Sequence, residues 1–402
     1  MPHTQSATFG LWTAVGGRHE PLRLAGISHF IEHMLFKGTR RRTARQIGQE
    51  VEAVGGYLNA TTTHDHTIYY GAAPADHFNR LSSVLCDMYL EPRFAAADIR
   101  REGGVIAEEI QMYQDEPSDL VQELLWEELW PNHALGRPLT GTLESIAKLK
   151  REDFLDYRRA HYQTGNTVVS AAGCVKHETV LARVEKLLGA LPAGRQSRVS
   201  KPPEIPKKPR VRIIPRETQQ LHLAFAVPCC SLHDEDRYAT TLLNTLLGGN
   251  MSSRLFQELR EKRGLCYTVS SNVSQYEDAG VINFYIGLDA KNLEKALRLL
   301  CREFKRFRDE PVRAAELNRA KEYAIGSSRM SLERTSAQNS RIGYSTMFYG
   351  HVLDAEESHA RLRAVTADGI QRVARKTLRP GLVTMTVIGQ VPEKTPVSEW
   401  LQ

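Results

Sequence analysis

The sequence repeats itself at a nearly constant separation, and this repeat limits the fold more than any other feature. An alternating run from Ala7 to Trp12 follows His3-Thr4-Gln5, and a second run from Leu221 to Phe225 follows Glu217-Thr218-Gln219. The two threonines are 214 residues apart. A chain that shows one pattern twice at this spacing is expected to contain a duplicated domain of about 200 residues.

The ends of the two halves show the same repeat. Asp153 begins a predicted helix that leads into the strand-like run Thr167–Gly173, and Asp368, 215 residues later, begins another that leads into Leu382–Gly389. Between the halves, the stretch Pro192–Arg210 is rich in proline, lysine and arginine and lacks apolar periodicity, as is typical of linkers. The sequence therefore predicts a first domain over residues 1–191, a linker over 192–210 and a second domain over 211–402.

Helices and strand pairs alternate within each half. Helices of about 10 to 20 residues between hairpin-like strand pairs are typical of the α+β class. The sequence therefore predicts two homologous α/β-sandwich domains, each with a mainly antiparallel sheet packed against helices. The predicted strands include Thr67–Ala72, Val211–Ile214, Tyr267–Val273 and Val281–Leu288, and the predicted helices include Ile27–Phe36, Ala44–Val54, Phe78–Glu91, Ala96–Asp115, Leu120–Leu129 and Ala315–Met330.

The composition excludes several classes of protein. Apolar residues make up 41% of the 402 residues and charged residues 25%, which is ordinary for a globular chain with buried cores. The net charge of +6 is spread along the sequence, and the dense basic run Arg40–Arg42 is interpreted as a solvated helix face, so nucleic acid is not an expected partner. No window approaches about 18 uninterrupted apolar residues, so no membrane span is expected.

The cysteines and the N-terminus favour the cytoplasm. None of the six cysteines forms a CxxC pair, and a disulfide framework is unusual in so long a chain, so inert thiols are expected, including the adjacent Cys229 and Cys230. The start of the chain, Met1–Gln5, has neither the basic residues nor the apolar stretch of a secretory signal. A cytoplasmic enzyme fits these observations.

The segment His29-Phe30-Ile31-Glu32-His33 carries the clearest chemistry. Residues four apart lie on one face of a helix, so His29 and His33 can bind the same metal ion. Glu32 lies beside that face, where its carboxylate can accept a proton from an attacking water. This HxxEH order is the inverzincin signature. Because so short a motif also occurs by chance in amphipathic helices, a metal site requires further ligands.

A third zinc ligand is predicted on the helix Ala96–Asp115. Catalytic zinc sites use three protein ligands. Glu102 and Glu109 are seven residues apart, about two turns, and share a face, whereas Glu108 is rotated about 100° from Glu109 and is expected to face solvent. Glu109 is therefore the candidate ligand, and Glu102 is a candidate for hydrogen-bonding a ligand or positioning water. The alternative is an ordinary acidic face of a helix.

The segment Gly26–Thr39 resembles the active-site segment of the pitrilysin/insulinase family of zinc peptidases, closest to the branch that includes mitochondrial processing peptidase and its bacterial relatives. In that family the third ligand is a glutamate some 76 residues beyond the second histidine, which is Glu109 here, and an accessory glutamate seven residues earlier is Glu102. The resemblance extends through Gly55–Thr61 to Gly389 and covers essentially the whole chain. It implies one zinc ion per chain, held by His29, His33 and Glu109, with Glu32 as the general base.

The second half is not predicted to hold zinc, because the position equivalent to His29 is Leu243. Family members have an arginine and a tyrosine seven residues apart at the place of Arg260 and Tyr267. The resemblance implies that these two side chains bind the substrate backbone and stabilise the developing oxyanion. The alternative is an exposed arginine at a helix end and a tyrosine on a strand.

The region from Asn59 to Thr63 borders the cleft as an edge strand in the family. An edge of this kind can pair with an extended peptide, so Asn59 and Ala60 are candidates for substrate contact. The nearby His64 and His66 would share one face of a strand with Asp65 on the other, which divides the potential ligands and disfavours a second metal site.

The resemblance implies a zinc-dependent metalloendopeptidase that hydrolyses short or unfolded peptides. Related enzymes enclose the substrate in a chamber of four such domains, and this chain supplies two, so the expected partner is a second copy or an inactive paralogue. One alternative is a catalytically silent scaffold subunit, although degenerate relatives usually lose part of the set His29, Glu32, His33 and Glu109. A structural zinc in a basic binding protein is disfavoured because no cysteine lies near the motif.

The family's first domain normally begins with a strand before the one from Ala7 to Trp12. Its counterpart in the second half is Val211–Ile214. We therefore expect about 15 to 20 further residues with strand-like alternation upstream of Met1. A targeting signal ahead of such a strand would change the expected compartment.

Overall fold

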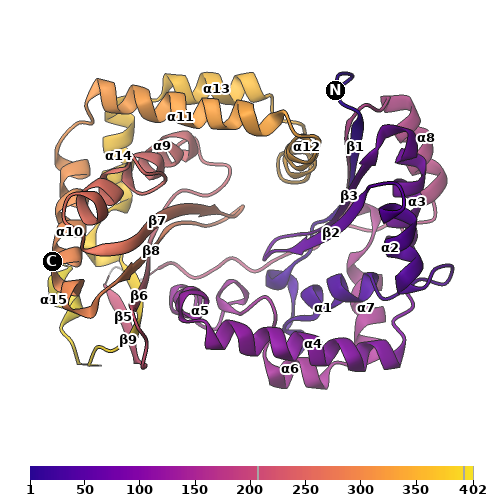
Figure 1. Cartoon of the computed structure of the whole chain (residues 1–402), viewed down its shortest axis with the longest axis horizontal. Helices are drawn as coiled ribbons and strands as arrows, with labels where there is room; N and C mark the ends of the chain where they lie inside the picture. The colour runs from indigo at the N-terminus through magenta and orange to yellow at the C-terminus, as the bar shows by residue number, and fades with distance from the viewer. Residues whose placement is uncertain (206–207, 393, 402) are drawn as a thin grey trace. The chain divides into compact units, whose positions relative to one another are not determined.

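Two separate β-sheets organise the chain, one in each of two units (Figure 1). The computed structural model describes residues 1–205, 208–392 and 394–401. Each unit draws on both halves of the sequence. The first consists of Met1–Gln111, Arg137–Ser200 and Arg329–Asp354, and the second of Met112–Gly136, Lys201–Ser328 and Ala355–Gln402.

The first unit contains an antiparallel sheet with the strand order β2-β3-β1-β4. Its strands are β1 (Ser6–Thr13), β2 (Tyr57–Thr62), β3 (Thr67–Pro74) and β4 (Thr167–Gly173). The helices that begin in this unit are α1 (Ile27–Leu35), α2 (Ala44–Glu52), α3 (Phe78–Leu90), α4 (Ala96–Asp115), α6 (Leu143–Lys148), α7 (Arg151–His161), α8 (His177–Leu188) and α12 (Thr335–Tyr349).

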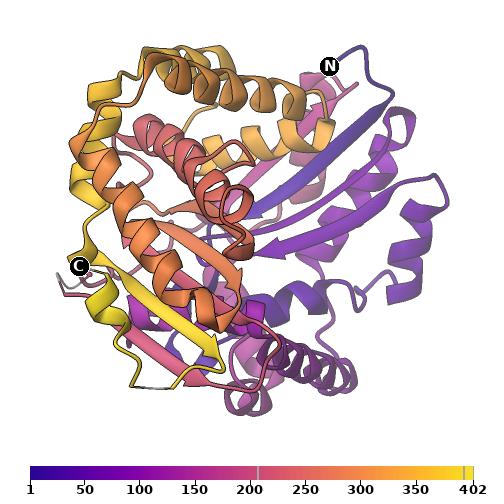
Figure 2. The same ribbon diagram turned by 60° about the vertical axis from the view of Figure 1, so that its left-hand side comes forward.

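The second unit contains a sheet with the order β5-β9-β6-β8-β7. The run β9-β6-β8-β7 repeats the order β4-β1-β3-β2 of the first sheet, and β5 pairs in parallel with β9, side by side in Figure 2. The strands are β5 (Arg210–Pro215), β6 (Leu221–Pro228), β7 (Cys266–Gln275), β8 (Gly280–Leu288) and β9 (Thr384–Gly389). The helices that begin in this unit are α5 (Pro117–Leu129), α9 (Arg237–Leu247), α10 (Leu293–Asp309), α11 (Ala314–Leu332), α13 (Ala355–Ala364), α14 (Ala367–Thr377), α15 (Val397–Trp400) and a π-helix over Phe256–Glu261.

The two sequence halves exchange one helix each. Helix α12, from the second half, packs on β1 and β4 of the first sheet, and α5, from the first half, packs on β6 and β9 of the second. The side chains of β1 alternate between the two faces of the sheet, and both faces are covered, so nearly all of the strand is buried. Phe9 and Leu11 join the core of the first unit beside α3, while Thr8, Gly10 and Trp12 lie on the face toward α12.

The contact between β1 and α12 depends on two glycines. A Cβ atom on Gly343 of α12 would lie 2.1 Å from the ring of Trp12, and one on Gly10 would lie 2.6 Å from the side chain of Asn339. The Trp12 indole N–H donates to the Ser170 hydroxyl at 2.8 Å, which fixes the ring under the helix. Helix and sheet therefore approach more closely than larger residues would permit.

The predicted fold class is confirmed, since two units of sheet and helix repeat one strand order. Helix Ala96–Asp115 and strand Thr167–Gly173 lie at their predicted bounds, and the other named elements differ by a few residues at their ends. The run from Leu382 begins with a short 3-10 turn over Pro380–Leu382, so β9 starts at Thr384. Within the described residues, no helix has the length and apolar character of a membrane span.

The glycine at position 343 provides a test of the helix exchange. We expect Gly343→Ala to lower the free energy of unfolding by about 1–3 kcal/mol, because the added methyl group overlaps the Trp12 ring. Gly326→Ala on α11 is the matched control, since nothing lies within 4 Å of its Cβ position. That change should be neutral or stabilising by up to about 1 kcal/mol through helix propensity. Denaturant unfolding measures both, and equal effects would show that the close contact is unimportant.

Candidate active site

A buried carboxylate fixes the start of helix α1. Glu20 accepts hydrogen bonds from the backbone N–H groups of Gly26 (2.7 Å) and Ser28 (2.8 Å), which otherwise have no partner within the helix. Gly26 precedes the helix with φ of 91°, a conformation that favours glycine. Burial raises the pKa of Glu20 to about 7, against the lowering effect of these two N–H donors. Glu20 thereby sets the position of the helix that carries the HxxEH motif.

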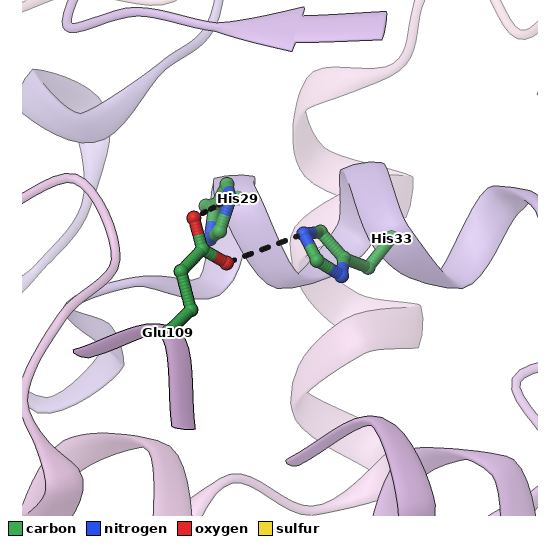
Figure 3. A group of neighbouring side chains, drawn as sticks. All are labelled: His29, His33 and Glu109. Atoms are coloured by element: carbon green, nitrogen blue, oxygen red, sulfur yellow. Dashed lines mark ion pairs between the residues drawn. The ribbon is translucent and has the colours of Figure 1, made fainter. Parts of the chain in front are cut away.

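His29, His33 and Glu109 converge between α1 and α4 (Figure 3). The two imidazoles lie on one face of α1 with ring centroids 4.6 Å apart. One carboxylate oxygen of Glu109 lies 3.8 Å from His29 Nε2 and the other lies 3.8 Å from His33 Nε2. All three side chains are partly exposed, so the group is open to solvent on one side.

Glu102 connects α4 to α1 a second time. Its carboxylate is buried, with one oxygen 2.9 Å from His33 Nδ1 and the other 2.7 Å from Lys37 Nζ. A carboxylate at Nδ1 favours the tautomer that carries its proton there and leaves the Nε2 lone pair free toward Glu109. Lys37 supplies the positive charge that a buried carboxylate requires.

Burial shifts the protonation of the neighbouring groups in opposite directions. Burial, with a smaller contribution from the nearby His33, lowers the pKa of His29 to about 4, so the His29 imidazole is neutral at physiological pH and able to bind a metal. Burial also raises the pKa of Glu32, and the charge of Glu109 adds to that effect. The Thr62 hydroxyl of β2 donates to Glu32 at 2.5 Å and opposes the rise.

The donor set fits a zinc ion. Two imidazoles and one carboxylate are the ligands of a known class of catalytic zinc site. Their ligand atoms lie within 4.8 Å of one another. Neighbouring ligand atoms in a tetrahedral site with bonds of about 2.1 Å are about 3.4 Å apart, so the two His–Glu109 distances of 3.8 Å need to shorten by about 0.4 Å and a separation of 4.8 Å by about 1.4 Å. Within the described residues, this is the one group of three or more His, Cys, Asp or Glu side chains with such spacing.

The predicted substrate residues lie on β2, at one end of the first sheet. In an antiparallel ladder every second residue pairs through its backbone hydrogen bonds, and Thr63 N–H donates to the His66 carbonyl. Ala60 is three residues before Thr63 and so has the opposite orientation, with its backbone N–H and C=O pointing away from β3. The Ala60 N–H instead donates to its neighbour's side chain, Asn59 Oδ1, at 2.8 Å. The Asn59 side chain is exposed, whereas that of Ala60 is buried.

Arg260 and Tyr267 belong to the second unit and lie close to each other. The Arg260 guanidinium carbon is 5.5 Å from the centre of the Tyr267 ring. Arg260 is on the π-helix, and Tyr267 occupies a shift in register between β7 and β8, two irregularities that often re-aim side chains at functional sites. Tyr267 is 70% exposed, so its hydroxyl-bearing ring extends into solvent.

Three contributors to the site were missed by the sequence analysis. Glu20 and Thr62 lack a recognisable motif, because their roles arise from the fold and not from local spacing. Lys37 follows His33 by four residues, one helical turn, and that spacing was a usable signal for a cation beside the motif.

Comparison with known proteins identifies the family. The family model described as Insulinase (Peptidase family M16) matches residues 1–143, and the one described as Peptidase M16 inactive domain matches residues 148–323. A Streptomyces coelicolor protein named an uncharacterized zinc protease is 37% identical over 409 residues, which cover 98% of this chain and 87% of the relative. The chain belongs to the insulinase family, peptidase family M16. The family resemblance predicted from the sequence is confirmed.

Further relatives of this insulinase-family chain agree with that assignment. A Bacillus subtilis protein, also named an uncharacterized zinc protease, is 34% identical over 375 residues, covering 93% of this chain and 91% of the relative. The crystal structure of a protease from Helicobacter pylori superposes with a TM-score of 0.88 at 20% identity, covering 96% of this chain and 94% of that one. At this identity the structural likeness supports the fold alone.

The buried cap of α1 gives a prediction for this site. We expect Glu20→Ala to lower the free energy of unfolding by about 2–4 kcal/mol, because two buried N–H donors lose their acceptor. Glu116→Ala is the matched control: Glu116 caps α5 in the same way, but its carboxylate is fully exposed, so water replaces it and little change is expected. Chemical denaturation of both variants compares the two caps. A Glu20→Ala protein as stable as the Glu116→Ala protein would contradict this role.

Proposed function

We propose that this chain is a zinc-dependent metalloendopeptidase. The observation that carries the proposal is the convergence of His29 Nε2 and His33 Nε2 on the two carboxylate oxygens of Glu109, each at 3.8 Å. The relatives named zinc proteases and the insulinase-family membership support the same reaction class. In this proposal His29, His33 and Glu109 hold one zinc ion.

Zinc bound there would act as a Lewis acid that polarises the attacking water and the peptide carbonyl. Glu32 is the proposed general base. Its position one residue before His33 puts the carboxylate at the edge of the ligand group, and its raised pKa makes it a stronger proton acceptor than an exposed glutamate. The Thr62 hydroxyl orients the carboxylate from β2. Glu102 holds His33 in the tautomer that presents Nε2.

Strand β2 is the proposed binding edge for the substrate. An extended peptide can add to the end of an antiparallel sheet through backbone hydrogen bonds, which favours short or unfolded substrates over folded ones. The Ala60 N–H would then exchange its bond to Asn59 Oδ1 for a carbonyl of the peptide, and Asn59 Oδ1 could accept a hydrogen bond from the peptide backbone. Thr62, two residues farther along β2, already contacts Glu32, so the edge leads to the proposed base.

We further propose that the active enzyme is a dimer, either of two copies or of this chain with an inactive paralogue. Arg260 and Tyr267 then serve the active site of the partner chain. A guanidinium and a phenol are suited to stabilise the negative charge that develops on the scissile carbonyl. The exposure of Tyr267 agrees with a role in binding a molecule outside its own unit.

Three single substitutions test the zinc site and its base. Glu32→Gln should retain zinc, because its amide oxygen can still accept from Thr62, but lose peptide cleavage by 10²- to 10⁴-fold or more. Glu109→Gln should lose zinc affinity, and Glu108→Gln, at the exposed neighbouring position, should keep both zinc and activity. Metal analysis and cleavage of an unbiased peptide mixture, with and without a chelator, provide the readout. Cleavage by Glu32→Gln at near wild-type rate would exclude Glu32 as the base.

Mixing two inactive variants tests the dimer. Glu32→Gln lacks the proposed base and Tyr267→Phe lacks the phenol, so each homodimer should be inactive. If Tyr267 acts on the partner's site, a mixed dimer contains one site with both groups intact, and activity should return in part. Subunit exchange is followed with differently tagged chains. Demonstrated exchange without restored activity, or an active enzyme that sediments as a monomer, would reject the arrangement.

A further inference from the structure

The second unit contains a cysteine pair that the proposed peptidase reaction does not use. Cys229 and Cys230 follow the end of β6 and line a cavity of about 260 Å³ together with Thr240 of α9 and Lys376 of α14. Both thiols are free and only partly buried, so small molecules in the cavity can reach them. The sequence predicts inert thiols here, and the surroundings of Cys230 favour a different interpretation of this one thiol.

Two side chains form hydrogen bonds with the Cys230 sulfur. Gln275 Nε2 donates to Sγ at 3.1 Å, and the Thr240 hydroxyl lies 3.2 Å from it, whereas the adjacent Cys229 thiol donates to the Cys230 carbonyl at 3.5 Å. The carbonyls of Cys230 (3.2 Å) and Ser231 (3.4 Å) also lie within hydrogen-bond distance of Gln275 Nε2, so its two N–H groups are shared among these oxygens and the sulfur. Donors directed at a sulfur stabilise its thiolate.

The backbone holds the sulfur in this position. A Cβ atom on Gly280 would lie 2.1 Å from the Cys230 carbonyl oxygen and 3.0 Å from Cys229 Sγ, so β8 packs directly against the pair. The Cys229 N–H also donates to the Gly280 carbonyl at 2.8 Å. The pair therefore has little freedom to turn away from Thr240 and Gln275.

The acidity of Cys230 agrees with this geometry. The adjacent Cys229 thiol, together with Thr240 and Gln275, lowers the Cys230 pKa to about 7, against the raising effects of burial and of Asp234. The other charged side chains on the cavity pair with each other, since Asp236 accepts from Lys376 at 2.7 Å and from Arg372. Burial raises the pKa of Cys86 to about 12 and those of Cys266 and Cys301 to about 11.

We propose that Cys230 is a modifiable thiol that reacts with low-molecular-weight disulfides entering this cavity. The Cys230 thiolate, its proton already released to solvent, attacks one sulfur of the disulfide. A bond forms between Cys230 Sγ and that sulfur while the original S–S bond breaks, and the leaving thiolate takes the electron pair and binds a proton from water. Cys230 is oxidised to the mixed disulfide, and the released half is reduced to a free thiol.

Alkylation with iodoacetamide over a range of pH tests the proposal on the intact chain. The rate at Cys230, followed by peptide mass spectrometry, should rise with a midpoint near pH 7, against about 8.5 for an ordinary thiol. The exposed Cys174 is the internal reference, and a Cys230→Ser protein confirms which of the adjacent cysteines reacts. Oxidised glutathione should then add one glutathionyl group to the wild type at this position, and dithiothreitol should remove it.

Two further variants link the reactivity to the surrounding donors. Gln275→Leu and Thr240→Val each remove one donor, and each should move the Cys230 midpoint to higher pH without changing the reaction of Cys174. If either variant fails to fold, the wild-type midpoint alone decides. A Cys230 midpoint of about 8.5 or above, or glutathionylation of Cys174 in preference to Cys230, would overturn the proposal. Because neither assay requires zinc or peptide cleavage, its failure is separate from failure of the proposed function.

Discussion

The candidate site depends on the contacts that the buried carboxylate of Glu102 makes with helix α1. A carboxylate without water must have charged or hydrogen-bonding partners, and Glu102 finds them in His33 and Lys37, both at or just beyond the C-terminal end of α1. These two contacts fix how α4 lies along α1. Glu109 is seven residues farther on the same face of α4, so fixing Glu102 also brings Glu109 to the open side of both imidazoles.

Partial burial shifts the pKa of His29 and that of Glu32 in opposite directions, and each shift suits the role proposed for that residue. A neutral imidazole is the form that binds metal, and burial keeps His29 neutral down to a pH of about 4. A carboxylate that accepts a proton works best when its pKa approaches the working pH, and burial moves Glu32 in that direction. Thr62 limits the rise, so β2 both offers an edge for a peptide and tunes the group proposed to act on it.

Local periodicity was enough to predict the elements, but not how they pack. Spacing within about two helical turns predicted both the helix Ala96–Asp115 and the shared face of the two histidines on α1. The 76-residue spacing to Glu109 came from the family resemblance. The helix exchange had no local signal, because α5 and α12 are positioned by packing on strands far away in sequence. Glu20 and the donors around Cys230 likewise become functional candidates only through contacts that the fold creates and that no local motif indicates.

Comparison of the two units shows how much apolar burial is lost where the first unit carries the HxxEH motif. Helix α9 occupies in the second unit the place in sequence order that α1 has in the first, and its residues at the motif positions are Leu243, Leu246 and Leu247, all buried in the core. The first unit carries His29, Glu32 and His33 there instead, all partly exposed. Replacing buried leucines by polar groups gives up about 1.5–3 kcal/mol of burial per side chain. In the first unit the contacts of Glu20, Glu102 and Lys37 add to the apolar face of α1 in holding the helix in place.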